Sequence, residues 1–357
     1  MSKGVSVNIN QAKNSLRRII QYNLSRPKGY RLVPFLWSAP GVGKSSIIFQ
    51  LAEEFGMGVK DVRLATMSVL DLRGVPYKDD KGEETLTRWA RPEFAQSDGN
   101  YILFLDELPS APPTVQAAAY EIMLDRKVGG HPLPDDVIVV AAGNRQEDRG
   151  VVYEMPVPLR NRLVHYNIEP DVDAFIEYGM QKGINEAILA FLKFNPKLLH
   201  QMPSGTENAF PTPRSWEFLS GVMHMGIEFH DMAGIIGEGA AAEFNAFLKI
   251  RNKLPDVPKL LEKGEVWRTD ELSLQYAFTF SLATHFIQKY EEVRKSKAQK
   301  ERLINNFIDI VSAQDEEMMV LSFFLVRGVN GLVGDLLLNE KYTTGVINKV
   351  SSVLRPQ

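Results

Sequence analysis

An apolar run that leads into a glycine-rich turn is the feature that most limits how this chain of 357 residues can fold. Residues 32–37 form the apolar run, and the turn contains Gly41-Val42-Gly43-Lys44-Ser45. Apolar side chains at helical spacing follow over residues 47–55, and Gly56 ends that pattern. This order predicts a buried strand, then a loop that binds phosphate, then a helix.

The turn matches the second half of the phosphate-loop pattern, which is glycine, four residues, glycine, lysine, and serine or threonine. Ser38 replaces the first glycine, and a serine fits there if the position needs no positive φ. Backbone N–H groups of such a loop, together with the N-terminus of the next helix, bind phosphate oxygens. Lys44 would reach the β- and γ-phosphates, and Ser45 would place its hydroxyl on Mg²⁺.

The alternative is a glycine-rich turn that joins a strand to a helix and binds nothing. The strand before the turn and the helix after it favour nucleotide binding. The residues predicted to bind the nucleotide are Ala39, Pro40, Gly41, Val42, Gly43, Lys44, Ser45 and Ser46.

Strands and helices alternate up to about residue 170. Near-continuous apolar strands that alternate with helices indicate a parallel sheet with helices on both faces, so we expect an α/β core. The predicted strands cover residues 61–65, 101–105, 137–142 and 164–168, and predicted helices cover residues 9–25 and 112–125.

Polar residues follow two of these strands, at the edge where a parallel sheet binds its ligands. Asp106 and Glu107 end the strand over residues 101–105, and Asn144 ends the strand over residues 137–142. Asp106 would bind Mg²⁺, directly or through a water, and Glu107 would position and deprotonate the attacking water. Asn144 would hold that water or the γ-phosphate. Each could instead be an exposed polar residue in a turn.

Beyond about residue 170 only helical patterns follow. Residues 201–213, rich in Pro, Ser, Gly and Asn, are expected to form an exposed connector. The predicted helices cover residues 172–182, 186–194, 215–225, 233–249, 273–300, 299–313 and 316–326.

Composition excludes several kinds of site. The chain has no cysteine, which removes disulfides, thiolate nucleophiles and cysteine-based zinc sites and fits a reducing compartment. Its 41 Lys+Arg and 44 Asp+Glu give a net charge of −3, so no overall field would hold it to nucleic acid or to an anionic membrane. No apolar run approaches the about 20 residues of a membrane span, and the polar N-terminus lacks the apolar core of a signal peptide. We expect a soluble cytoplasmic protein.

The six histidines form no metal-binding pair in the sequence and are expected to be structural or on the surface. Mg²⁺ is the only metal that we expect.

The order of these motifs resembles the AAA+ ATPases, and more narrowly the MoxR family. Residues 106–116, DELPSAPPTVQ, are similar to that family's DEINRAPPKVQ, and residues 129–134, GGHPLP, resemble its hairpin before the next strand. Residues 72–94 are similar to its insertion near the second helix, and residues 210–214, FPTPR, resemble the Ser-Pro-Arg that opens a helix of its lid. The resemblance covers about residues 10–225.

The resemblance implies three more site residues. Arg162 lies where the family has its arginine finger, which reaches the γ-phosphate of a neighbouring subunit and can change the rate by about 10³–10⁵. Arg160 is the close alternative, and Leu163 departs from the Phe that usually follows the finger. Arg214 lies where the family has a lid arginine that contacts the γ-phosphate. Arg160 and Arg162 could instead be surface arginines or form an ion pair, and Arg214 could instead form a capping or interdomain salt bridge.

The resemblance also implies a function. It implies an ATPase that uses ATP and Mg²⁺, forms a ring taken here as a homo-hexamer, and remodels or matures a partner protein in a chaperone-like manner. In this family the partner is often a protein with a von Willebrand A domain. Residues 72–94 and 127–136 are candidates to contact it. The implied parts are an ATPase core over residues 1–170, the start of a helical lid over residues 171–230, and a helical C-terminal region over residues 231–357.

Two other functions fit part of the sequence. An AAA+ nucleic-acid motor or loader would keep the ATPase, but the near-neutral charge and the lack of an appended DNA-binding motif argue against it. A scaffold that binds ATP and scarcely turns it over would keep the loop, but the presence of Glu107 and Arg162 argues against that.

Overall fold

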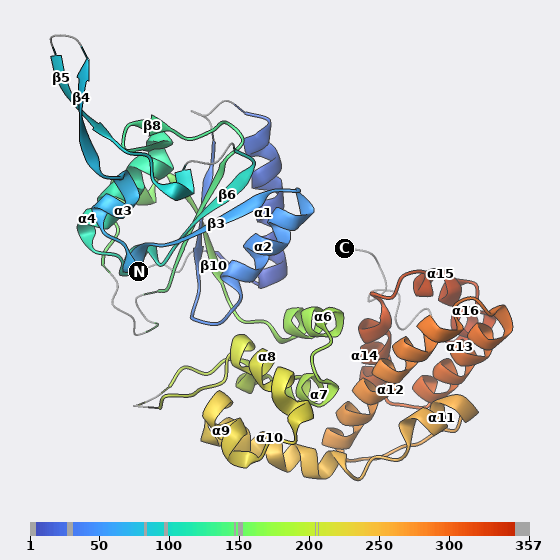
Figure 1. Cartoon of the computed structure of the whole chain (residues 1–357). Helices are drawn as coiled ribbons and strands as arrows, with labels where there is room; N and C mark the ends of the chain where they lie inside the picture. The colour runs from blue at the N-terminus through green and yellow to red at the C-terminus, as the bar shows by residue number, and fades with distance from the viewer. Residues whose placement is uncertain are drawn as a thin grey trace. The chain divides into compact units, whose positions relative to one another are not determined.

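The computed structural model consists of two compact units, Met1–Asp171 and Val172–Gln357, called here the N-terminal and C-terminal units (Figure 1). The residues that it describes are 5–26, 31–81, 84–95, 99–145, 148, 153–203, 205 and 207–346. No helix within these ranges has both the length and the hydropathy that crossing a membrane requires.

A six-stranded sheet forms the middle of the N-terminal unit, with the order β1-β10-β2-β9-β6-β3. Every neighbouring pair is parallel, which confirms the predicted parallel sheet. The strands are β1 Ser6–Val7, β2 Val33–Trp37, β3 Gly58–Arg63, β6 Tyr101–Asp106, β9 Ile138–Gly143 and β10 Leu163–Ile168.

Two of these strands differ from the prediction. β1 has only two residues, which are too few to produce a recognisable pattern. β3 begins at Gly58, and Leu64–Thr66, at the end of the predicted strand, forms a 3₁₀ turn instead. The residues of β3 are mostly exposed or half-buried because β3 is an edge strand, so the apolar signal is weak there.

The sheet separates two hydrophobic clusters. Along β6, Tyr101, Leu103 and Leu105 belong to one cluster, and Ile102 and Phe104 belong to the other. Because successive side chains of a strand point to opposite faces, a strand that is buried on both faces is apolar at every position. Burying one such side chain fully contributes about 1.5–3 kcal/mol.

Helices cover both faces, as predicted (Figure 1). Helices α1 and α2 contribute residues to the cluster that contains Phe104, whereas α3, α4 and α5 contribute to the cluster that contains Leu103. After α4 the chain forms a π-helix, Glu121–Asp125, within the segment predicted as one helix. The bounds are α1 Ile9–Leu24, α2 Lys44–Glu54, α3 Val69–Arg73, α4 Pro113–Tyr120 and α5 Val157–Arg160.

Two hairpins lie beside each other in this unit. The longer one, β4 Pro76–Lys81 with β5 Glu84–Trp89, projects from the body of the unit (Figure 1). The shorter one consists of β7 Lys127–Val128 and β8 His131–Pro132. His131 Nε2 lies 2.6 Å from the carbonyl oxygen of Trp89, so the turn end of the shorter hairpin contacts the base of the longer one.

The C-terminal unit is helical and is built around one hydrophobic cluster that extends from Phe175 to Val346. The longest helix, α12, packs against α7, α13 and α14. The helices are α6 Val172–Lys182, α7 Glu186–Phe194, α8 Pro213–Val222, α9 Phe229–Ile236, α10 Glu238–Arg251, α11 Val257–Lys263, α12 Leu272–Val293, α13 Lys297–Ser312, α14 Glu316–Val326, α15 Leu332–Leu337 and α16 Glu340–Gly345.

The prediction of a single helix over residues 233–249 is wrong. Gly237 has φ +84° and ends α9, and α10 begins at Glu238. A Cβ at Gly237 would lie 2.7 Å from the carbonyl oxygen of Ala209, so this break needs glycine for both its backbone conformation and its close packing.

Candidate active site

The predicted phosphate loop lies between β2 and α2. Gly41 and Gly43 have φ values of +77° and +110°, in the region that favours glycine. Gly43 is the N-cap of α2 and supplies no side-chain hydrogen bond to the first turn. Because the first N–H groups of a helix have no partner within it, this turn can bind an anion.

Lys44 is directed into the protein and is only 9% exposed. Its Nζ donates to the carbonyl oxygen and the Oγ of Ser38, at 3.1 and 3.0 Å, and to Oδ1 of Asn144 at 3.0 Å. Desolvating a lysine ammonium is unfavourable unless acceptors surround it. These acceptors therefore fix the cation at the carboxyl edge of the sheet.

Ser38 is fully buried and does not have a positive φ. Its Oγ donates to the carbonyl oxygen of Ala39 at 2.9 Å, in addition to accepting from Lys44. The departure from glycine at this position is therefore compatible with the loop, and the hydroxyl adds a contact to Lys44 that a glycine would lack.

Asp106 and Glu107 end β6, which neighbours β9, and β9 in turn neighbours β2. The segments that carry Glu107, Asn144 and Lys44 therefore begin at adjacent parallel strand ends. Oδ1 of Asp106 accepts from the backbone N–H of Glu107 at 2.8 Å. Glu107 has φ +59°, an uncommon conformation for a residue with a side chain. Such backbone conformations are often found at active sites.

Gly143 explains how the strand end that carries Asn144 approaches the segment after Glu107. A Cβ at Gly143 would lie 2.2 Å from Cδ of Pro109. Any side chain there would push apart the two segments that carry Asn144 and Glu107. Nothing in the sequence indicated this contact.

Asp106 and Ser45 are the predicted magnesium ligands. Asp106 follows Phe104 by two positions, so it lies on the sheet face that α2 covers. On the neighbouring strand, burial raises the pKa of Asp61, and the Asp106 carboxylate raises that pKa further. Carboxylate and hydroxyl oxygens, the groups that Asp106 and Ser45 carry, are donors that fit Mg²⁺. Among the described residues no group of three or more acidic or histidine side chains could hold a metal.

Arg160 is the last residue of α5 and Arg162 follows it, before β10, which lies on the other side of β2 from β9 and β6. Arg160 is half-buried, and its Nη2 lies 3.7 Å from Oε1 of Glu154. Arg162 is exposed, and its backbone N–H donates to the carbonyl oxygen of Leu159. An exposed guanidinium at a helix end is accessible to another subunit.

Arg214 belongs to the C-terminal unit, in the first turn of α8. Thr212 and Ser215 form a capping box around it, which fixes the start of the helix. The structure thus brings Lys44 and Asn144 into contact, places the segments of Asp106 and Glu107 beside them, and holds Arg214 in a separate unit.

Arg145, next to Asn144, was missed by the sequence analysis. Its guanidinium donates to both carboxylate oxygens of Glu169, at 2.6 and 3.4 Å, and its backbone N–H donates to Asp148. Glu169 lies 24 positions away along the chain, so no local pattern could indicate the pair. The ion pair holds the strand end that carries Asn144.

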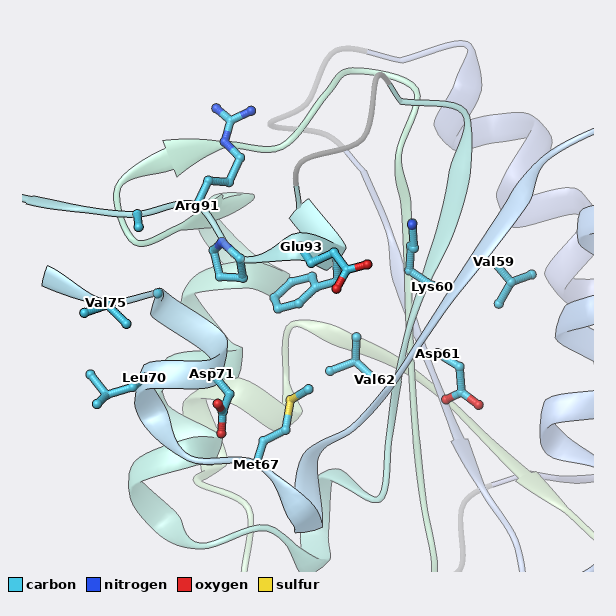
Figure 2. Close-up of a pocket in the computed structure, with 14 residues that line it drawn as sticks. Val59, Lys60, Asp61, Val62, Met67, Leu70, Asp71, Val75, Arg91 and Glu93 are labelled. Carbon is cyan, nitrogen blue, oxygen red and sulfur yellow. The ribbon is translucent and has the colours of Figure 1, made fainter.

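A cavity of about 530 Å³ lies away from the phosphate loop, between β3, α3 and the segment after the long hairpin (Figure 2). Figure 2 shows Val62 directed toward this space and Asp61 directed away from it. Residues 59–62, 67, 70–71, 74–75 and 90–94 line it. None of the predicted nucleotide-binding residues lines it, so the cavity belongs to the insertion over residues 72–94 and to the sheet edge.

Comparison with known families identifies the class of the N-terminal unit. Residues 34–164 match the family described as "ATPase family associated with various cellular activities (AAA)". The match extends from β2 through Arg162 and contains every candidate site residue except Arg214. This stretch is an AAA-family ATPase domain. No curated protein matches the chain.

Solved structures with a similar arrangement include a RuvB variant from Thermotoga maritima, with 14% identity and a TM-score of 0.40 over 79% of this chain and 88% of that chain. Another is NtrX from Brucella abortus in complex with ADP, with 14% identity and a TM-score of 0.41 over 99% of this chain and 70% of that chain.

Proposed function

We propose that this chain is an Mg²⁺-dependent ATPase of the MoxR-like group of AAA+ proteins, and that it couples ATP hydrolysis to the remodelling or maturation of a partner protein. The observation that carries the proposal is the contact between Lys44 and Asn144. It joins the phosphate loop to the end of β9, beside the strand that carries Asp106 and Glu107. A buried lysine at this point is the group that a triphosphate needs.

Each residue has one role in the proposed reaction. The N–H groups of residues 39–46 and the Lys44 ammonium bind the phosphates, and Asn144 orients the attacking water. Glu107 accepts the proton of that water as it attacks the γ-phosphorus and the bond to the β-phosphate oxygen breaks. Ser45 and Asp106 would hold Mg²⁺, which neutralises charge on the phosphate oxygens.

Arg162, with Arg160 as the alternative, would complete the site of a neighbouring subunit, and Arg214 would contact the γ-phosphate from the lid. A site built from two subunits requires an oligomer, for which we propose a homo-hexameric ring. The hairpins over residues 72–94 and 127–136 would contact the protein partner, for which a von Willebrand A domain is the proposed class. A chain without cysteine suits the reducing cytoplasm.

Phosphate release by Glu107→Gln tests the proposal. The variant removes the base and keeps the size of the side chain, so we expect turnover to fall by about 10²–10⁴. Binding of a fluorescent ATP analogue should remain. Glu53→Gln, an exposed change of the same kind on α2, is the matched control and should leave turnover unaltered.

Two outcomes would favour the alternatives. Equal inactivity of wild type and Glu107→Gln, with nucleotide still bound, would indicate a scaffold rather than an enzyme. Stimulation of turnover by DNA that declines with salt would indicate a nucleic-acid motor.

A further inference from the structure

His165 lies in the middle of β10 and makes two hydrogen bonds to segments on either side of it. Its Nδ1 is 2.9 Å from the indole Nε1 of Trp37, the last residue of β2. Its Nε2 is 2.8 Å from the carbonyl oxygen of Arg160, the last residue of α5. One imidazole therefore joins the strand before the phosphate loop to the turn that carries the two candidate arginines.

The partners determine the protonation state of the ring. An indole nitrogen can only donate, so Nδ1 of His165 must accept from Trp37. A carbonyl oxygen can only accept, so Nε2 must donate to Arg160. Only the neutral imidazole with its proton on Nε2 satisfies both partners. Trp37 thus selects the tautomer that caps the carbonyl of Arg160.

The capped carbonyl belongs to a very short helix. α5 has four residues, and the carbonyl groups at a helix C-terminus have no partner within the helix. The described side chain that satisfies the carbonyl of Arg160 is that of His165, from the adjacent strand. The direction in which the chain leaves α5 toward Arg162 therefore depends on this hydrogen bond.

The hydrogen bond between His165 and Trp37 connects the ring to the segment that contains the phosphate loop. Trp37 precedes Ser38, which accepts from Lys44, and Trp37 pairs with Gly143, which precedes Asn144. The imidazole of His165 packs against two aromatic rings of β2. The centroid of the imidazole lies 5.9 Å from that of the Phe35 ring and 6.2 Å from that of the Trp37 ring. The rings of Trp37 and His165 therefore connect the residue before the loop to α5.

We propose that His165 is a positioning residue that holds the Arg160–Arg162 turn in place through the carbonyl of Arg160, and that it links this turn to the protomer's own phosphate loop through Trp37. This inference rests on the proposed ATPase. In the proposed ring, Arg160 or Arg162 would enter the site of a neighbouring subunit. The position of that arginine would then depend, through His165 and Trp37, on β2, which leads into the phosphate loop of its own subunit.

Two substitutions separate the two bonds of His165. The amide nitrogen of glutamine reaches the place of Nε2, so His165→Gln keeps the donor to Arg160 and loses the acceptor for Trp37. Asparagine reaches only the place of Nδ1, so His165→Asn keeps a partner for Trp37 and loses the cap. We expect kcat to fall about tenfold for His165→Asn and to stay within about twofold for His165→Gln, because a partly buried hydrogen bond of this kind is worth up to about tenfold. Nucleotide Kd should not change in either.

A double-mutant cycle tests whether His165 acts through the arginines. In a chain that also carries Arg160→Ala and Arg162→Ala, which keeps the backbone carbonyl, His165→Asn should cause no further loss of kcat. A further tenfold loss would overturn the inference, and so would equal effects of the Asn and Gln variants. Tyr166→Phe, at the next position of β10 and on the opposite face, is the control and should leave kcat unchanged.

A second measurement does not depend on ATP hydrolysis. Trypsin cleaves after arginine, and a loosened α5 should be cut faster at Arg160 and Arg162. We expect His165→Asn to be cut at this turn about tenfold faster than His165→Gln, with equal rates elsewhere in the chain. Equal cleavage would show that the histidine does not hold the turn. If cleavage differs while Glu107→Gln has no effect on turnover, the contact stands and the ATPase proposal fails.

Discussion

The two units of the chain achieve stability in different ways. In the N-terminal unit a parallel sheet divides the apolar residues into two clusters, and the polar groups of the candidate site collect at one edge of that sheet. In the C-terminal unit a single apolar cluster reaches nearly every helix, and polar pairs join the helices at its margin. The N-terminal unit thus places Lys44, Asp106, Glu107 and Asn144 near the strand ends of its sheet, whereas the helical unit depends on packing.

The largest expected effect lies in the N-terminal unit and concerns rate rather than stability. Arg162→Ala should reduce ATP turnover by about 10³–10⁵, because a guanidinium from a neighbouring subunit offsets charge in the transition state. Phosphate release at saturating ATP measures this effect. Arg18→Ala, an exposed change on α1, is the control. If Arg160→Ala causes the loss and Arg162→Ala does not, the finger is Arg160.

The next largest effect should be confined to the C-terminal unit. Phe286 is fully buried, and its ring is stacked on that of Phe307 with centroids 4.1 Å apart. Phe286→Ala should lower the free energy of unfolding of this unit by about 3–5 kcal/mol, because it leaves a cavity. Hydrogen exchange followed separately in peptides of each unit would locate the loss.

Phe218→Ala gives the matched control, since this side chain of α8 is 62% exposed. The control should change stability by less than about 0.5 kcal/mol. Faster exchange in the N-terminal unit after Phe286→Ala would contradict the view that the two units are stabilised separately.

A smaller effect is expected at a single hydrogen bond of the C-terminal unit. The indole Nε1 of the fully buried Trp216 donates to the carbonyl oxygen of Leu198 at 2.7 Å. Trp216→Phe should destabilise the unit by about 1–3 kcal/mol, because it leaves a buried carbonyl without its donor. Urea denaturation measures this. The same change at the half-buried Trp267 should have less effect, and an equal effect would show that ring volume rather than the bond matters.

The smallest effects concern two carboxyl groups whose pKa values shift in opposite directions. In the C-terminal unit burial alone would raise the pKa of Asp335, but hydrogen bonds from Lys300 and Tyr290 outweigh it and hold the pKa below its ordinary value. This stabilisation is present above the unfolded pKa of about 3.9 and is lost as the pH falls through the folded pKa. In the N-terminal unit burial raises the pKa of Asp61, so folding favours the protonated carboxyl. The resulting contribution to the free energy of unfolding is present below about pH 3.9 and is lost as the pH rises through the folded pKa.

Two asparagine variants check these signs. At neutral pH Asp335→Asn should lower the unfolding midpoint, and Asp61→Asn should raise it. Both differences should shrink toward acidic pH, where the carboxyl groups are protonated. Thermal unfolding between pH 3 and pH 8 measures them, and two shifts of the same sign would contradict the contrast between the units.

Sequence patterns predicted best the elements whose signal is local. α6, α7 and α14 have the bounds that apolar spacing predicted, because contacts between positions three and four apart define a helix face. The break at Gly237 was missed because alanines continue the helical pattern beyond it. The short helices α11, α15 and α16 were missed because six or seven residues give too few turns to show a period.

In the candidate site, too, the residues with a local sequence signal were predicted and the long-range contacts were not. Lys44 was predicted from the phosphate-loop pattern, and Asp106, Glu107 and Asn144 were predicted because they lie at the ends of strands that a parallel sheet brings together. The bond between Trp37 and His165 joins residues 128 positions apart and depends on which strands are neighbours. The left-handed backbone of Glu107 also escaped prediction, because glutamate has no preference for that conformation.

The acceptors around Lys44 have a consequence for how any nucleotide would bind. Since the ammonium already donates to Ser38 and Asn144, a phosphate group reaching the loop must displace at least one of them. Binding is then an exchange of partners, and the measured affinity reports the difference between two sets of contacts. Where the displaced acceptor is the amide of Asn144, the arrival of the substrate would itself release the group that is proposed to orient the attacking water.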